Sequence, residues 1–251
     1  MASVGHYEEQ IPAHCEIHGE YECTKTTYTM FSPHYSICQE CEQDNERKEL
    51  AAQQAKDHAE KVYKIQSRLK RACIPLRFEG ASFDTYREYS GEIKDKKNKC
   101  VEFAKTFSGG TSLILCGNTG TGKTHLALSV LKYAIQQRSM TGKYIRTSKM
   151  IDEVKETYNK SSVERKSEVI ERFVAPELLV LDEIGVQHGT DTEKMILFEI
   201  LNERYENVKS TIVIGNLDLP GLTEYMGERV IDRMKENGGM VIAFTWESKR
   251  A

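Results

Sequence analysis

The sequence has no long apolar run, no internal repeat and no low-complexity tract. A bilayer-spanning helix needs about 20 consecutive apolar residues, and the apolar runs here are only a few residues long, so we expect no membrane-spanning segment. The first ten residues have no basic segment followed by an apolar stretch. A secretory signal is therefore not expected, and the predicted location is the cytoplasm.

An excess of positive charge is also missing. The 35 basic and 38 acidic residues give a formal net charge of -3, which excludes a generally basic surface that coats nucleic acid. Any contact with DNA must therefore be local, or shared among copies in an assembly. Charged residues make up 29% of the 251 and the mean hydropathy is -0.54, values typical of a soluble globular protein.

The seven cysteines are too few and too unevenly spaced for a disulfide framework, and four of them precede residue 45. Cys15-x-x-His18 and Cys38-x-x-Cys41 form two pairs with zinc-ligand spacing. Thiolates and imidazole suit Zn²⁺ better than Mg²⁺ or Ca²⁺. Cys23 is an alternative to His18 as a ligand. Four protein ligands would leave no position for water, so the ion would be structural and would fold a segment too small to fold alone.

Three stretches of the chain differ in character, and we predict a zinc-binding module over 1–44, a helical linker over 45–73 and an ATPase domain over 74–251. Apolar residues recur at helical spacing from about 41 to 71. This narrow stripe suits packing on a partner helix or on the next domain, with a solvated linker helix as the alternative. Beyond residue 78, expected strands alternate with expected helices, which indicates an α/β fold with a parallel sheet covered on both faces. The expected strands are 112–116, 144–147, 178–181, 211–215 and 240–245, and the expected helices are 123–138, 148–158, 163–173 and 192–208.

Residues 117–124 are a full match to G-x-x-x-x-G-K-[ST], and they follow an expected strand and precede an expected helix. The glycines let the backbone wrap a polyphosphate with its N–H groups pointing inward. Lys123 would contact the β- and γ-phosphates, and Thr124 would offer a hydroxyl to Mg²⁺. The predicted ATP-binding residues are Gly117, Asn118, Thr119, Gly120, Thr121, Gly122, Lys123, Thr124 and His125.

A second acidic motif, Asp182-Glu183, ends the expected strand 178–181. Asp182 would hold the water shell of the Mg²⁺, and Glu183 would polarise the attacking water. An acidic pair at a strand end can also be a helix cap. Together with the phosphate loop, the pair favours hydrolysis of ATP over transfer of a phosphoryl group to a small substrate.

Three further polar residues are candidates for the same site. Asn216 ends the strand expected beside the phosphate-loop strand, where it could orient the water, although asparagine is also common in turns. Arg229 and Arg233 are four residues apart on one helical face. Arginine suits the charge of a transition-state phosphate, although paired surface arginines are usually solvated.

These motifs resemble those of DnaC-type helicase loaders, AAA+ ATPases that are related to the IstB transposition ATPases. The resemblance covers about residues 74–250 and is carried by the phosphate loop, by IPLRF at 74–78, ASF at 81–83, LDEIGVQ at 181–187, GERVIDRM at 227–234 and FTWES at 244–248. It implies a five-stranded AAA+ sheet with the phosphate-loop strand at its centre and no separate helical lid. The zinc module is absent from bacterial DnaC proteins but is similar to that of phage-borne members.

The resemblance also implies roles for three arginines. Arg233 would be the arginine finger that reaches the γ-phosphate of a neighbouring subunit, Arg229 would support it, and Arg250 would be a sensor acting within its own subunit, with Lys249 as the alternative.

The implied function is an ATP-dependent loader that delivers a hexameric, ring-shaped replicative helicase onto single-stranded DNA. The zinc module and its helix would hold the helicase, and the ATPase domains would self-associate. The alternatives are an IstB-like transposition ATPase, a nucleotide-gated adaptor without essential turnover and, last, a small-molecule kinase.

Overall fold

The computed structural model describes residues 6–28, 31–159, 161–185 and 189–248. They form two compact units, Met1–Tyr63 and Lys64–Ala251. Arg250 and Lys249 lie outside the described residues. No helix in the described ranges is both long and apolar enough to cross a membrane.

The first unit contains an antiparallel sheet of order β1-β2-β3, made of β1 (His6–Cys15), β2 (Gly19–Tyr28) and the short β3 (His34–Tyr35). β1 and β2 pair along their whole length, and Cys15 opposite Gly19 closes the hairpin. Of the side chains in β1 and β2, both fully described, only Cys23 is buried. This is why apolar periodicity does not reveal these strands in the sequence.

Helix α1 (Gln39–Arg71) confirms the helix expected from about 41 to 71, and the division between the two units falls inside it. None of its residues is buried. In the first unit its apolar side chains Leu50 and Val62 are exposed, whereas Leu69 packs on the core of the second unit. The proposed domain boundaries at 44/45 and 73/74 stay predictions.

The second unit is built on a five-stranded parallel sheet of order β5-β6-β7-β4-β8, so the predicted α/β architecture is confirmed. The expectation that the phosphate-loop strand is central is wrong, because β4 lies between β7 and β8 and β7 is the middle strand. The order depends on how the connections cross the sheet, which strand patterns do not encode. The strands are β4 (Leu113–Gly117), β5 (Gly142–Arg146), β6 (Leu178–Ile184), β7 (Ser210–Gly215) and β8 (Met240–Phe244).

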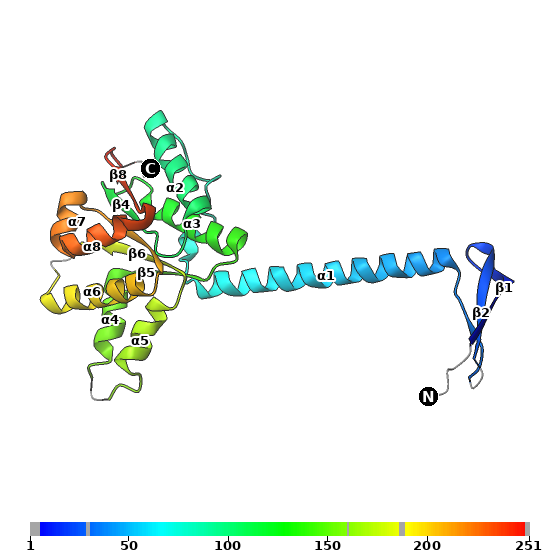
Figure 1. The fold of residues 1–251 in the computed structure, drawn as a ribbon. Helices are drawn as coiled ribbons and strands as arrows, with labels where there is room; N and C mark the ends of the chain where they lie inside the picture. Colours follow the sequence, from blue (N-terminus) through cyan, green and yellow to red (C-terminus); the bar gives the residue numbers. More distant parts are fainter. Residues whose placement is uncertain (1–5, 29–30, 160, 186–188, 249–251) are drawn as a thin grey trace. The chain divides into compact units, whose positions relative to one another are not determined.

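Helices cover both faces of this sheet (Figure 1). Alternate residues of β4 face opposite cores: Leu113 and Leu115 pack with α2 and α3, and Ile114 and Cys116 pack with α4 to α8. The helices are α2 (Gly91–Thr106), α3 (Lys123–Arg138), α4 (Thr147–Glu156), α5 (Lys166–Val174), α6 (Asp191–Glu206), α7 (Leu219–Met226) and α8 (Glu228–Lys235), with short 3₁₀ turns η1 (Leu76–Phe78) and η2 (Glu236–Gly238).

Candidate nucleotide site and metal centre

The phosphate loop joins β4 to α3 at the carboxyl end of the sheet, and its glycines are required by close backbone approaches. A Cβ atom on Gly117 would lie 2.3 Å from the Phe244 carbonyl oxygen. Gly122 has a φ of +94°, and a Cβ there would lie 2.6 Å from the Tyr86 ring. A side chain at either position would displace the loop, so the sequence G-x-x-x-x-G is fixed by packing as well as by backbone conformation.

Lys123 and Thr124 begin α3 and face the loop and the neighbouring strand. The Nζ of Lys123 donates to the carbonyl oxygens of Gly117 at 2.7 Å and Asn118 at 2.6 Å, so the ammonium group lies within the loop. The Thr124 hydroxyl donates to Oδ2 of Asp182 at 3.1 Å. A hydroxyl beside a carboxylate supplies the hard oxygen donors that Mg²⁺ prefers.

Two residues that the sequence analysis missed hold Asp182 in place. Tyr144 donates its phenol to Oδ2 of Asp182 at 2.9 Å, and the Thr147 hydroxyl donates to the Asp182 main-chain oxygen at 3.0 Å. Burial and the adjacent carboxylate raise the pKa of Tyr144, so its phenol stays protonated and remains a donor. Tyr144 lies in the middle of β5 and Thr147 directly follows that strand, next to β6, and only this strand pairing could have identified them.

Glu183 points differently from Asp182 because the backbone is irregular between them. The pairing of β6 with β7 shifts register between Leu181 and Ile184, and Glu183 has a φ of +62°. Such a bulge re-aims a side chain and stores strain, which is common beside active sites. The Glu183 carboxylate is about half exposed and lies 3.9 Å from Nε of Arg146. Its position is open to water, as a general base requires.

Asn216 directly follows β7 and is exposed. Because β7 lies between β4 and β6, the carboxyl ends of the three strands carry the phosphate loop, Asn216 and the Asp182-Glu183 pair side by side. The pairing of β4 with β7 confirms the prediction that the strand before Asn216 lies beside the phosphate-loop strand.

The remaining loop residues differ in what their side chains contact. Asn118 donates to the carbonyl oxygens of Thr245 at 2.9 Å and Trp246 at 3.1 Å, which ties the loop to the segment after β8. Thr119 is exposed. The Thr121 hydroxyl donates to the Asn118 carbonyl oxygen at 2.8 Å. Asn118 and Thr121 thus shape the loop from within.

His125, also predicted to bind ATP, is engaged with the segment before α2. Its Nε2 donates to the Ser82 carbonyl oxygen at 2.8 Å, and its ring packs edge-on against Tyr86 at 5.3 Å between centroids. Tyr86 in turn donates its hydroxyl to the Thr121 carbonyl oxygen at 3.1 Å. The segment at 82–86 is thereby held against the phosphate loop.

An aromatic pocket beside the loop is the feature that the sequence analysis missed most clearly. The side chains of Tyr86, Tyr89 and Trp246 line it together with Gly120 and Gly122 of the loop. Aromatic side chains next to a phosphate-binding loop suit a flat nucleobase. These aromatics come from segments 160 residues apart in the chain, so no local pattern links them.

The two predicted arginines of α8 lie in different environments. Arg229 is exposed. Arg233 is half-buried, donates from Nη1 to Oδ1 of Asn202, and stacks 4.6 Å from the centre of the Tyr205 ring. It lines a pocket with Ser112, which precedes β4, whereas the phosphate loop follows β4. Five strand residues at about 3.3 Å each separate these two ends by roughly 16 Å, too far for Arg233 to reach the phosphate site of its own subunit.

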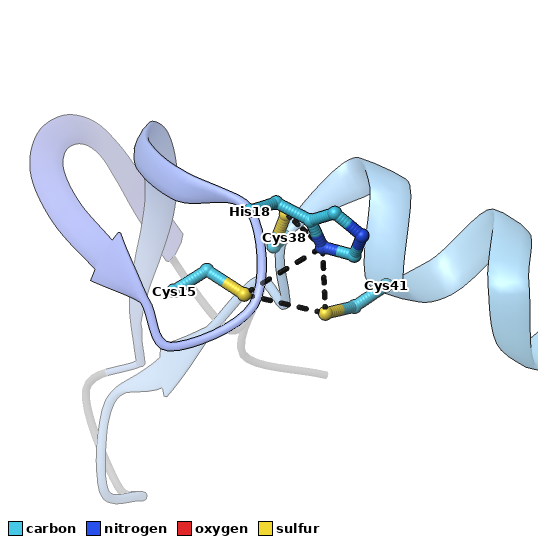
Figure 2. Close-up of side chains that lie close together, drawn as sticks. All are labelled: Cys15, His18, Cys38 and Cys41. Carbon is cyan, nitrogen blue, oxygen red and sulfur yellow. Dashed lines mark hydrogen bonds between the residues drawn. The ribbon is translucent and has the colours of Figure 1, made fainter.

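The predicted metal ligands of the first unit converge, as Figure 2 shows. Their ligand atoms all lie within 4.8 Å of one another. Sγ of Cys15 is 3.4 Å from Sγ of Cys41, and Nδ1 of His18 is 3.3 Å from Cys41 and 3.7 Å from Cys15 and Cys38. Zinc–sulfur bonds of about 2.3 Å in a tetrahedron separate the ligand atoms by roughly 3.5–3.8 Å. The Cys₃His group therefore could bind Zn²⁺.

The surroundings of the cluster favour a cation. Backbone N–H groups of His18 and Ile17 lower the pKa of Cys15 to about 6, so a thiolate forms near neutral pH, while the hydrogen bond with Cys15 raises the pKa of Cys41 to about 11. The second ring nitrogen of His18 lies 3.6 Å from an Asp44 carboxylate oxygen and 3.8 Å from one of Glu40. Carboxylates in this place orient a metal-bound imidazole and raise its basicity.

Cys23, the alternative ligand, is outside the cluster. Its thiol is buried and donates to the Ser36 carbonyl oxygen at 3.3 Å. The alternation of side chains along β2 and the pairing of β2 with β3 fix this position, and the cluster uses His18 instead.

Residues 52–235 match the family described as IstB-like ATP binding protein. The replicative helicase loader DnaC of Buchnera aphidicola subsp. Acyrthosiphon pisum is 32% identical over 197 residues, 76% of this chain and 77% of that protein. DnaC of Escherichia coli K12 is 29% identical over 199 residues, 78% of this chain and 80% of that protein.

Two solved structures show the same fold. The crystal structure of the DnaC helicase loader superposes with a TM-score of 0.60 at 24% identity and covers 69% of this chain and 100% of that chain. AMPPCP-bound DnaA from Aquifex aeolicus superposes with a TM-score of 0.55 at 18% identity, covering 68% of this chain and 51% of that chain.

Proposed function

We propose that this chain, which belongs to the IstB/DnaC family of AAA+ ATP-binding proteins, is an ATP-dependent loader of a replicative DNA helicase. In this proposal it binds a ring-shaped helicase and delivers it onto single-stranded DNA. Similar proteins in Buchnera and Escherichia coli are named replicative helicase loaders, which favours this function over others of the family.

The nucleotide site supports turnover rather than binding alone. The phosphate loop and Lys123 would hold the β- and γ-phosphates. Mg²⁺ held at Thr124 and Asp182 would neutralise phosphate charge. Glu183 would take a proton from the attacking water, and Asn216 would orient that water. The aromatic pocket of Tyr86, Tyr89 and Trp246 would receive the adenine. The contact of Thr124 with Asp182 across α3 and β6 carries the proposal, because it brings the two nucleotide motifs together.

Hydrolysis would depend on a neighbouring copy. Arg233 is too far from its own phosphate loop to act there, but it could complete the site of an adjacent subunit, with Arg229 beside it. ATP binding would then favour an assembly, and hydrolysis would release it.

An Arg233→Ala substitution should separate binding from assembly-dependent turnover. We expect ATP affinity of the isolated subunit to stay the same, because Arg233 does not contact its own site. Turnover stimulated by assembly and single-stranded DNA should fall to the basal level of the isolated subunit. Phosphate release measured against protein concentration checks this. An undiminished rise of specific activity with concentration would rule out the role in trans.

The partner distinguishes the loader from the alternative in this family, a transposition ATPase. Co-purification of the full chain with purified hexameric replicative helicases and with transposases, in ATP, tests the proposal. We expect a complex with a helicase that changes with the nucleotide. Capture of a transposase, or of no helicase from a broad panel, would reject the loader.

A nucleotide-gated adaptor would also bind a helicase, but it would work without hydrolysis. Loading of the helicase onto a single-stranded DNA circle by a variant that binds ATP without hydrolysing it would support the adaptor instead.

A further inference from the structure

The net negative charge of the chain leaves contact with nucleic acid to local basic surface, and one such surface lies at the edge of the sheet in the second unit. Four cationic side chains line a single pocket there: Arg68, Arg71, Lys143 and Arg172. They come from the last turn of α1, from the edge strand β5 and from the last turn of α5. None of the described residues that line this edge pocket is acidic.

The positive charge of the edge pocket is only partly compensated. Arg172 pairs with Glu164 at 3.0 Å and lies 3.9 Å from Glu153. In the described part of the chain, no carboxylate forms an ion pair with Arg68, Arg71 or Lys143. Lys143 instead lies over the Phe173 ring at 4.9 Å. The Glu177 carboxylate accepts from the Thr141 N–H at 2.7 Å and hydroxyl at 2.9 Å, so one further negative charge lies beside the lining, and the net charge of the edge pocket stays positive.

Helix geometry alone does not explain this convergence. Basic residues in the last turn of a helix are favoured by the helix dipole, which accounts for Arg68, Arg71 and Arg172 taken singly. Lys143 is on a strand, which has no comparable dipole. Bringing like charges together is unfavourable unless an anion binds between them.

The walls of the edge pocket are fixed before any ligand binds. The backbone N–H of Tyr144 donates to the Ala72 carbonyl oxygen at 2.8 Å, which ties the end of α1 to β5. The fully buried Arg204 donates to the carbonyl oxygens of Phe173 at 2.8 Å and Val174 at 3.0 Å, which ties down the end of α5. Ligand binding would thus cost little ordering of the main chain.

We propose that the edge pocket binds the sugar–phosphate backbone of single-stranded nucleic acid. This inference rests on the proposed function, because a helicase loader must bind single-stranded DNA. The inference adds the place on the protein where that strand binds. Guanidinium groups match phosphate oxygens in bidentate fashion. The other lining residues, Thr141, Gly142, Ala175 and Pro176, are small and uncharged, which suits sugar and backbone rather than readout of base edges. A flexible single strand can bend into a concave pocket, whereas a duplex presents its phosphates on a stiff convex surface.

The test is salt-dependent binding of a labelled oligo-thymidylate to the full chain in the presence of ATP. For a triple variant, Arg68→Gln, Arg71→Gln and Lys143→Gln, we expect affinity to fall at least about 10-fold. The slope of log affinity against log salt should shrink by about 2, the value for three lost phosphate contacts on a single strand. Lys94→Gln, Lys96→Gln and Lys99→Gln on α2 remove the same charge elsewhere in the unit and should leave affinity and slope unchanged.

Three outcomes would overturn the assignment. If the wild type binds and the triple variant binds with the same affinity and slope, the pocket is wrong and the loader function stands. Wild-type protein that fails to bind the oligonucleotide would reject both. Equal or tighter binding of a duplex through the same three residues would reject the single strand.

A measurement on wild-type protein covers the case in which the triple variant does not fold. The oligonucleotide should protect Lys143, but not Lys94, from acetylation by acetic anhydride. Unprotected Lys143 in the bound complex would overturn the proposal.

Discussion

A Glu183→Gln variant is expected to bind ATP normally and to hydrolyse it about 10²–10⁴-fold more slowly, the usual contribution of a general base. The amide keeps the size of the side chain but cannot accept the proton of the attacking water. The position of the Asp182 carboxylate should not change in this variant, because Thr124 and Tyr144 donate hydrogen bonds to it. Glu183 contributes only its backbone N–H to that carboxylate, at 2.8 Å. Steady-state phosphate release and binding of a fluorescent ATP analogue measure the two effects separately.

Lys123→Ala is the matched comparison for Glu183→Gln. Lys123 is buried in the phosphate loop and should contribute to ATP binding, whereas Glu183 should contribute only to hydrolysis. We expect the alanine variant to lose ATP affinity, whereas Glu183→Gln keeps it. If Glu183→Gln turned over ATP within a few-fold of the wild type, another group would have to activate the water. If Lys123→Ala retained normal ATP affinity, the phosphate loop would not be the nucleotide site.

Removal of the metal is expected to unfold the β-sheet of the first unit while the second unit keeps its ATP affinity. Among the described residues of the first unit only Cys23 and Cys38 are buried, so its stability should come from the ion. Structural zinc sites in small peptides supply about 10–16 kcal/mol. Native mass spectrometry should find one zinc per chain. After chelation, amide hydrogens of the β1–β2 ladder should exchange at the rate of an unfolded chain, and those of β4 should stay protected.

Cys38→Ala and Cys23→Ala form a matched pair, because both thiols are buried in the first unit and only Cys38 belongs to the cluster. We expect the Cys38 variant to lose zinc and the protection of β1 and β2. The Cys23 variant should keep its zinc. A metal-free native mass of the wild type, or loss of zinc only from the Cys23 variant, would contradict the ligand set.

The motifs that could be predicted from the sequence are those whose chemistry demands a fixed local spacing. The phosphate loop, the Asp182-Glu183 pair and the two Cys/His pairs each lie within a few residues, because one turn of backbone must present them together. The structure brings Thr124 to Asp182 and brings the two Cys/His pairs into one cluster.

Contacts between segments far apart in the chain could not be predicted from local sequence patterns. Tyr144 binds Asp182 only because β5 pairs with β6, and Trp246 reaches the aromatic pocket only because β8 pairs with β4. His18 joins the cluster from the turn between β1 and β2, whereas Cys23 lies within β2 and donates its thiol to the Ser36 carbonyl oxygen. The strands β1 and β2 could not be predicted from apolar periodicity, because most of their side chains are not buried.

Residue types at short spacing predict the α/β class, the nucleotide motifs and the three cysteines of the candidate metal cluster. Strand pairing and packing between distant segments place the phosphate-loop strand off the centre of the sheet, Arg233 at the far end of β4 from its own phosphate loop, and four cations in one pocket. Strand order and the convergence of distant side chains arise from these long-range contacts, which no local pattern encodes.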